Sequence, residues 1–172
     1  MKSLLSLTLL LLCFSTQWLK AETTNSSALD LLPETLYNAQ GQSVSKTSLK
    51  GKWVGLYFSA QWCPPCRTFT PKLIDFRNRF AEEFEVVLIS FDQTPQAQSK
   101  YMSKYTMPWL VTEHQSEEVE QLRRYFRISG IPTLIILSPE GQIISTRGRS
   151  EVARSPGNAL ELWKKLGKAD RG

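Results

Sequence analysis

The sequence predicts an α/β domain with a central mixed β-sheet that is flanked by helices on both faces. Two runs, 53–59 and 84–91, are apolar almost throughout, as expected of strands buried on both faces of a sheet. Segments with apolar residues at helical spacing alternate with these runs. A third apolar strand, 134–137, is followed by a turn and a returning segment at 142–146, which is typical of a hairpin. This order places helices on two sides of one sheet.

The N-terminal segment has the order of charge, apolar stretch and small residue that is typical of a secretory signal peptide. Lys2 precedes an apolar stretch from Leu4 to Phe14, and a polar turn ends at Ala21. The apolar stretch is shorter than the ~20 residues that a membrane span needs. We therefore expect a signal peptide at residues 1–21 and a periplasmic or secreted protein, with no stable membrane insertion after cleavage. An uncleaved membrane anchor is the alternative.

Polar residues at 22–33 are expected to form a tether, which leaves residues 34–168 for the domain. Loss of residues 1–21, which carry two lysines, would lower the formal net charge from +5 to +3 and would remove Cys13. The remaining chain has no basic run interleaved with aromatic residues, so no nucleic-acid partner is expected. Outside one closely spaced pair no cysteine remains for a structural disulfide, and the fold must depend on its apolar core.

The first element of the domain is predicted to be an N-terminal β extension. In this hairpin, residues 36–37 and 43–44 flank a turn at 38–41. A glycine-containing loop then leads into the first buried strand. The helix that follows is predicted from about Cys63 to Ala81, and Pro71 should kink it because its ring removes one backbone hydrogen bond.

The second half of the chain alternates in the same way. A loop after the second buried strand leads into a helix near 96–105, and another helix is predicted at 117–126. Residues 130–133 contain glycine and proline and interrupt the helical pattern before the third strand. The segment 158–166 is amphipathic and is expected to form the last helix.

The segment Cys63-Pro64-Pro65-Cys66 lies between a predicted strand and a predicted helix. Two thiols at this spacing can close into a disulfide and can carry two electrons. We place Cys63 just before the helix, where free N–H groups and the helix dipole favour a thiolate. Pro64 suits the first helical position. Because both prolines lack an N–H group, the N–H of Cys66 is the expected donor to the sulfur, and the pKa of Cys63 should fall only moderately.

These positions predict separate roles for the two thiols. Cys63 should attack a partner disulfide, and Cys66, one turn inside the helix, should resolve the mixed disulfide. A structural disulfide or half of a zinc site are the alternatives, but a zinc site needs four ligands and His114 is the single histidine. No metal or other cofactor is predicted. Trp62 either contacts partners or packs at the strand end, and His114 is expected at the surface.

Two motifs resemble those of the thioredoxin superfamily, namely Trp62-Cys63-Pro64-Pro65-Cys66 and Gly130-Ile131-Pro132-Thr133. Further stretches are similar to the tryparedoxin and nucleoredoxin branch, namely 57–67, 69–71, 107–110 and 126–134. The resemblance covers about residues 35–150. It implies a thioredoxin fold in which Cys63 is the nucleophile and Cys66 the resolving thiol of a redox-active disulfide.

The resemblance also implies a docking site for substrates. A cis bond between Ile131 and Pro132 would face the cysteine pair, and the backbone before the proline would pair with an extended partner segment. The residues expected to bind substrate are Trp62, Pro64, Pro65, Ile131 and Pro132. The chain departs from the superfamily at Tyr57, where many thioredoxins carry a buried aspartate, so the base for Cys66 is unassigned. Residues 111–114 also replace a Pro-Phe pair of the branch.

Taken together, the sequence predicts an exported thiol–disulfide oxidoreductase that reduces protein disulfides. The two prolines argue against the very low thiol pKa of a strong oxidant, which favours reduction. A protein electron donor would be needed, because no flavin or nicotinamide motif is present. The alternatives are a disulfide oxidase or isomerase, or a partner-binding module in which the cysteines are incidental. A monomer is expected.

Overall fold

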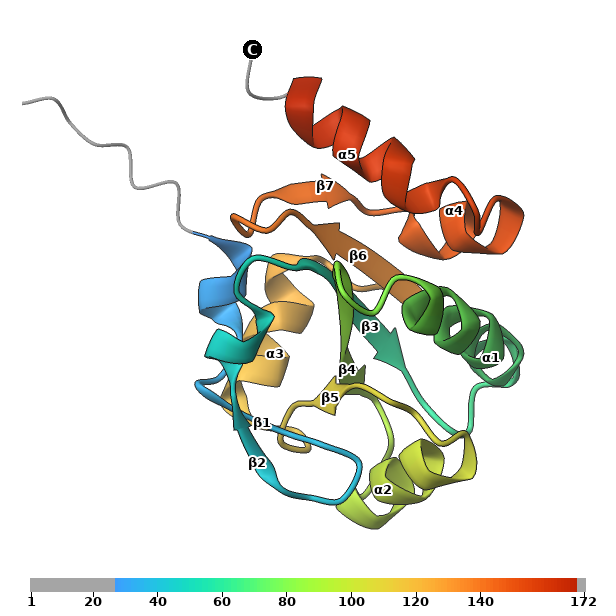
Figure 1. Ribbon diagram of the computed structural model, residues 1–172. Coiled ribbons are helices and arrows are strands. Elements are labelled where there is room, and N and C mark those ends of the chain that lie inside the picture. The colour runs from blue at the N-terminus through green and yellow to red at the C-terminus, as the bar shows by residue number, and fades with distance from the viewer. Residues whose placement is uncertain (1–26, 170–172) are drawn as a thin grey trace, which may run out of the picture.

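Seven strands form a single sheet in the computed structural model, which describes residues 27–169 of the chain (Figure 1). The strands are β1 (Thr35–Tyr37), β2 (Ser43–Ser45), β3 (Trp53–Ser59), β4 (Phe84–Ser90), β5 (Leu110–Val111), β6 (Thr133–Leu137) and β7 (Ile143–Ser145). Their order across the sheet is β2-β1-β5-β4-β3-β6-β7. The central β3 pairs in parallel with β4 and antiparallel with β6, which confirms the predicted mixed sheet.

Strand β3 is buried along its whole length because both faces of the sheet are covered. Its side chains alternate between two cores, as the pleat of a strand requires. Leu56 and Phe58 enter one core, and Tyr57 enters the other. Gly55 allows Phe84 to approach closely, since a Cβ at that position would lie 2.8 Å from the ring.

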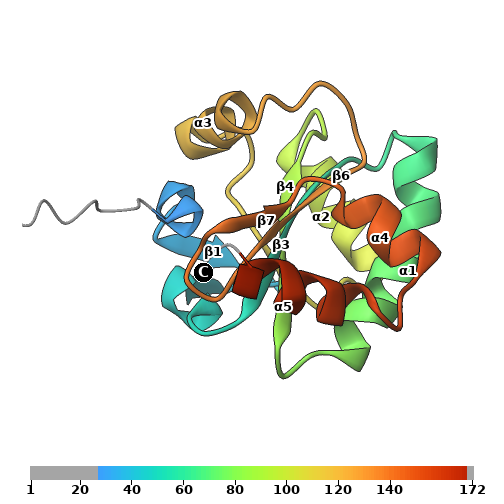
Figure 2. The same ribbon diagram turned by 90° about the horizontal axis from the view of Figure 1, so that it is seen from above.

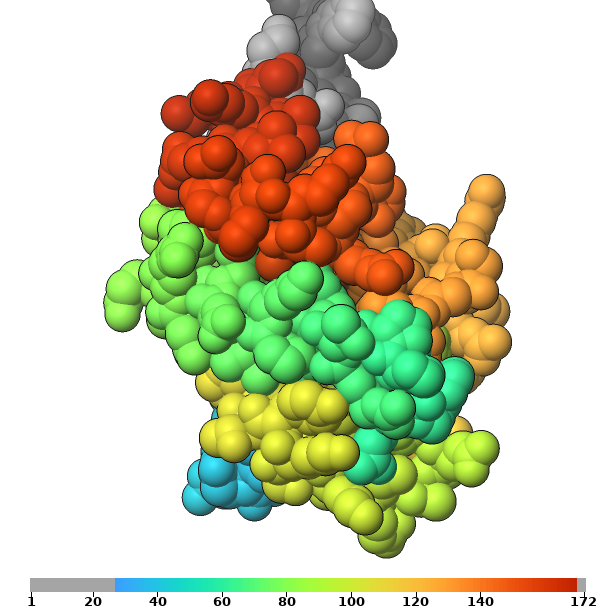
Figure 3. All heavy atoms as spheres, turned by 90° about the vertical axis from the view of Figure 1, so that its right-hand side faces the viewer, coloured from blue at the N-terminus to red at the C-terminus, as the bar shows by residue number. Residues whose placement is uncertain are grey.

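Helices lie on both sides of the sheet, as the sequence predicts (Figures 1 and 2). One face is covered by α1 (Pro64–Arg79), α2 (Pro95–Lys104), α4 (Gly148–Arg154) and α5 (Ala159–Ala169). The other is covered by α3 (Glu117–Tyr125) with the 3-10 turns η1 (Ala28–Leu31) and η2 (Lys46–Leu49). Figure 3 shows that α1 lies between α2 on one side and α4 and α5 on the other.

An aromatic cluster fixes α1 against the sheet. The ring centroids of Phe76 on α1 and Phe84 on β4 lie 5.1 Å apart, and Trp163 on α5 lies 5.4 Å from Phe76. Such pairs contribute about 0.5–1.5 kcal/mol each beyond the area that they bury. The cluster therefore holds the C-terminal half of α1 against the start of β4.

Two short elements, β5 and α4, are not predicted from the sequence. Strand β5 has only two residues, too few to show a period, and its pairing with β1 and β4 defines it. Helix α4 begins without a side-chain cap. It packs tightly on β6, because a Cβ at Gly148 would lie 2.7 Å from the side chain of Ile136.

The predicted tether begins to pack earlier than the sequence suggests. Ala28 and Leu32 are only 4% and 2% exposed, and the N–H of Ala28 donates to the carbonyl oxygen of Gly141 at 2.9 Å. Burial of apolar side chains thus draws η1 onto the domain. Residues 22–26 and the predicted signal peptide at 1–21 lie outside the described residues. Between residues 27 and 169, no helix has the length and apolar character to cross a membrane.

Candidate redox site

Cys63 occupies the N-cap position of α1. Its Sγ accepts the backbone N–H of Cys66 at 3.3 Å, in the way that a serine oxygen caps a helix. Pro64 and Pro65 fill the first positions of the helix, where an N–H group would have no helical partner. The placement predicted from the sequence is therefore found, including the donor from Cys66.

The two cysteines form a disulfide, and they differ in exposure. Their Cα atoms lie 5.2 Å apart. Cys63 retains 3% of its surface, whereas Cys66 has none. A visiting polypeptide therefore meets Cys63 first, and Cys66 lies behind it.

The segment before β6 lies directly against this pair. The carbonyl oxygen of Ile131 is 3.7 Å from Sγ of Cys63, and the peptide bond between Ile131 and Pro132 is cis. The antiparallel register of β3 and β6, in which Phe58 faces Thr133, brings this segment to the cysteines from a distant part of the chain. Ile131 is half-buried and Pro132 is buried.

Trp62 lies on the surface beside the disulfide and does not pack into the strand end. Its side chain is 57% exposed, and Nε1 donates to the carbonyl oxygen of Phe91 at 2.9 Å. The hydrogen bond orients the indole while leaving its face open. Of the two interpretations of Trp62, the geometry favours contact with a partner.

Asp92 is a supporting residue that the sequence analysis missed. It is 1% exposed, and its Oδ1 accepts the backbone N–H of Gln61 at 2.9 Å, just before Trp62. His114 is half-buried, with Nε2 2.7 Å from the carbonyl oxygen of Asp92, so it is not the isolated surface residue that we expected. An acidic residue directly after a buried strand is the signal that could have indicated this role for Asp92.

Hydroxyl groups contact the backbone carbonyl of Cys66 on its buried side. The hydroxyl of Tyr57 is 2.9 Å from Oγ1 of Thr70 and donates to the carbonyl oxygen of Cys66 at 3.3 Å. Tyr101 extends the network, 2.6 Å from Thr70. Burial, followed by the nearby Tyr101, raises the pKa of Tyr57 well above its usual range. Tyr57 is therefore a neutral hydrogen-bonding group and not the base for Cys66.

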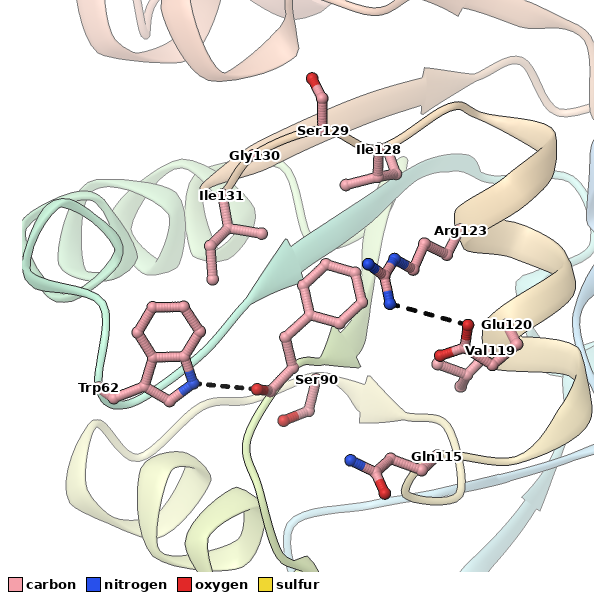
Figure 4. A pocket seen from close by; sticks show the side chains of 11 residues that line it. Trp62, Ser90, Gln115, Val119, Glu120, Arg123, Ile128, Ser129, Gly130 and Ile131 are labelled. Atoms are coloured by element: carbon pink, nitrogen blue, oxygen red, sulfur yellow. Dashed lines mark hydrogen bonds and ion pairs between the residues drawn. The ribbon is translucent and has the colours of Figure 1, made fainter.

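A groove of about 330 Å³ runs from Trp62, the residue before Cys63, to α3 (Figure 4). We call it the Trp62–Arg123 groove, because Trp62 lies at one end and Arg123 at the other. Its apolar lining includes Phe91, Val119, Ile128 and Ile131. The groove offers an apolar surface near Cys63 and, at its α3 end, the Arg123 cation paired with Glu120.

Comparison with known proteins agrees with this geometry. A family model described as thioredoxin-like matches residues 51–143, which is more than half of the 172-residue chain. The chain belongs to the thioredoxin-like family. A tryparedoxin of Trypanosoma brucei brucei is 45% identical over 124 residues, which cover 70% of this chain and 85% of the relative. Mouse nucleoredoxin is 42% identical over 121 residues, covering 68% of this chain but 27% of nucleoredoxin.

Solved structures give the same result for the fold. The structure of tryparedoxin from Trypanosoma brucei matches with a TM-score of 0.70 and 42% identity, covering 80% of this chain and 98% of that one. Native tryparedoxin I from Crithidia fasciculata matches with a TM-score of 0.68 and 42% identity, covering 76% and 93%. The predicted thioredoxin fold and the resemblance to the tryparedoxin and nucleoredoxin branch are confirmed. The chain spans about a quarter of the nucleoredoxins that it matches.

The relatives confirm one functional prediction and overturn another. Nucleoredoxins and tryparedoxins are thiol–disulfide oxidoreductases, so the predicted enzyme class is confirmed at the level of the family. They are cytosolic proteins, so the predicted periplasmic or secreted location is wrong. That prediction depended only on the order of charge, apolar stretch and small residue in residues 1–21, and such a local pattern does not by itself determine the compartment.

Proposed function

We propose that the chain is a thiol–disulfide oxidoreductase that reduces disulfides of partner polypeptides through Cys63 and Cys66. One observation carries the proposal. Cys63 caps a helix start and keeps 3% of its surface exposed, Cys66 is bonded to it from the fully buried side, and the carbonyl oxygen of Ile131 lies 3.7 Å from Sγ of Cys63. This combination supplies a reachable nucleophile, an internal resolving thiol and a backbone edge for docking.

The reaction starts from the reduced pair. The Cys63 thiolate attacks one sulfur of the partner disulfide, whose S–S bond breaks as the mixed disulfide forms, and the departing thiolate takes a proton. Cys66 then loses its proton to water and attacks Sγ of Cys63. The second partner thiolate leaves, and the Cys63–Cys66 disulfide forms. Two electrons thereby pass to the partner, and a dithiol donor protein returns the pair to the reduced state by the reverse exchange.

The neighbouring residues are assigned to docking. The backbone of Ile131, held by the cis bond to Pro132, would pair with an extended partner segment as one strand pairs with another. Trp62, Pro64 and Pro65 are exposed next to Cys63 and would cover the partner cysteine from the other side. Thioredoxin-like proteins act on protein or small-molecule disulfides, and a structure of tryparedoxin II holds glutathionylspermidine.

The arrangement of donors supports reduction rather than strong oxidation. A strong oxidant needs a highly stabilised thiolate in its reduced form. The prolines at the first two helical positions have no N–H group, and the backbone hydrogen bond to Sγ of Cys63 comes from Cys66. Equilibration of the pair with glutathione measures this directly, and a potential near the oxidising end would contradict reduction.

Reduction of insulin disulfides by the reduced protein tests the chemistry. We expect Cys63→Ser to abolish turnover and Cys66→Ser to accumulate a mixed disulfide with insulin, visible on a non-reducing gel. If Cys63→Ser still reduces insulin, the pair is not the reaction centre. If it binds partners as wild type does and only exchange is lost, docking and chemistry are separate properties of one surface.

A further inference from the structure

We propose that Arg123 selects partner polypeptides that carry a carboxylate near the reactive cysteine. This inference rests on the proposed function, because it concerns the partner of the same redox pair. Phe91 and Ile131 pack against the cluster that contains Cys63 and Cys66, and both also line the Trp62–Arg123 groove. A partner segment that reaches Cys63 therefore borders a groove whose α3 end carries the Arg123 cation beside Glu120 (Figure 4).

The guanidinium of Arg123 is oriented and available. It lies 5.5 Å from the centroid of the Phe91 ring, which favours a flat cation–π arrangement. Its side chain is 54% exposed, and within residues 27–169 it makes no hydrogen bond. A guanidinium has five donors in a planar fork, and two of them can hold one carboxylate. Arg123 is thus suited to bind an acidic side chain.

The ion pair between Glu120 and Arg123 is too weak to prevent the guanidinium from binding another carboxylate. The two side chains are separated by 3.8 Å, one turn apart on α3, and Glu120 is 44% exposed. Exposed pairs of this kind contribute little, since solvent screens them. An acidic residue of a partner, brought into the apolar groove and partly removed from water, can compete with Glu120.

The occupant that fits is an extended acidic polypeptide segment. Val119, Ile128 and Ile131 offer apolar surface for one side chain, while Arg123 offers charge for another. Arg67 adds a second cation on the other side of Trp62, where its Nη1 donates to the carbonyl oxygen of Gln61 at 3.2 Å. Complementary charge speeds encounter and suppresses partners of like charge, so basic segments should be disfavoured.

The test uses three peptide disulfides that are identical except for one residue near the cysteine, which is Glu, Gln or Lys. The reduced protein should reduce the Glu peptide about three- to fivefold faster than the Gln peptide, the range expected for one exposed to partly buried ion pair. The ratio should decrease as salt is added, because salt screens the pair. A ratio of one at low salt, or faster reduction of glutathione disulfide than of the Glu peptide, would overturn the proposal.

Variants of α3 assign the effect to one residue. Arg123→Gln should bring the ratio close to one, and Arg123→Glu should reverse it in favour of the Lys peptide. Arg124→Glu is the matched control, since it makes the same charge change at an exposed neighbour that does not line the groove. Equal shifts for Arg123→Glu and Arg124→Glu would refute selection by Arg123. If wild type cannot reduce the Gln peptide, or Cys63→Ser can, the proposed function itself fails.

Discussion

The buried carboxylate of Asp92 accepts the backbone N–H of Gln61 at 2.9 Å and joins the end of β4 to the turn before Trp62. The other carboxylate oxygen of Asp92 accepts the hydroxyl of Ser90 at 2.8 Å. The backbone carbonyl oxygen of Asp92 lies 2.7 Å from Nε2 of His114. Segments that are far apart in the sequence are thus held together at the redox end of the sheet.

Asp92→Ala should destabilise the protein and slow its reaction with partners. The change leaves the Gln61 N–H without its acceptor, and a buried unsatisfied donor costs about 1–3 kcal/mol of the free energy of unfolding. Urea denaturation measures the loss, with the exposed neighbour Gln93→Ala as control. Asp92→Asn retains an acceptor for Gln61 and should lose less. Equal stability of Asp92→Ala and Gln93→Ala would show that the contact is unimportant.

Trp62→Ala should lower kcat/KM for insulin reduction about tenfold while changing stability by less than about 0.5 kcal/mol, since exposed positions rarely affect stability. Trp62→Phe keeps apolar surface but loses the hydrogen bond to Phe91, so its effect should be intermediate. Tyr125→Ala is the control, because Tyr125 is 53% exposed and does not line the groove. Comparable rates for the two alanine variants would refute a docking role for Trp62.

Tyr57 should make stability depend on pH only in alkaline solution. Its pKa is raised in the folded protein from the ordinary value of 10.0, mainly by burial. Below that pH both states keep the proton and the stabilisation is complete. Above it the unfolded chain binds fewer protons, so stability falls by up to about 1.4 kcal/mol per pH unit.

The variant Tyr57→Phe isolates this contribution. It should lose about 1 kcal/mol at pH 8, because its hydrogen bonds to Thr70 and Cys66 are gone. The difference in stability from wild type should then decrease as the pH rises above about 10. There the unfolded wild-type chain is stabilised by ionisation of Tyr57, whereas the phenylalanine variant has no such group. Urea titrations between pH 8 and 11 measure the difference, with Tyr125→Phe as the control for loss of one tyrosine. A difference that stays constant with pH would contradict the prediction.

The buried carboxylate of Glu151 should stabilise the fold without taking part in the reaction of Cys63 and Cys66. It is 7% exposed, and it accepts Nε1 of Trp163 at 2.7 Å and the hydroxyl of Ser145 at 2.9 Å. Glu151→Ala leaves two donors unsatisfied and should cost about 2–4 kcal/mol, whereas Glu151→Gln should cost less. Glu161→Ala at an exposed site is the control for thermal unfolding. Insulin reduction should be unchanged in every folded variant.

The main elements could be predicted from the sequence because their signals are local. Two-sided burial makes β3 and β4 apolar throughout, and α1 begins after a cysteine followed by prolines that suit the first positions of a helix. Elements that depend on distant partners were missed. Strand β5 needs β1 and β4 beside it, and η1 is held by the carbonyl oxygen of Gly141.

For the redox site, the chain itself determined the cysteine pair, its place ahead of a helix and its resemblance to a family, because these are properties of neighbouring residues. Only the tertiary structure decided that the carbonyl of Ile131 lies against Cys63, that Asp92 accepts the N–H of Gln61 and that Arg123 lines the same groove as Trp62. Each of these contacts joins residues that are tens of positions apart. Their meeting depends on strand order and register across the whole sheet, which no local pattern encodes.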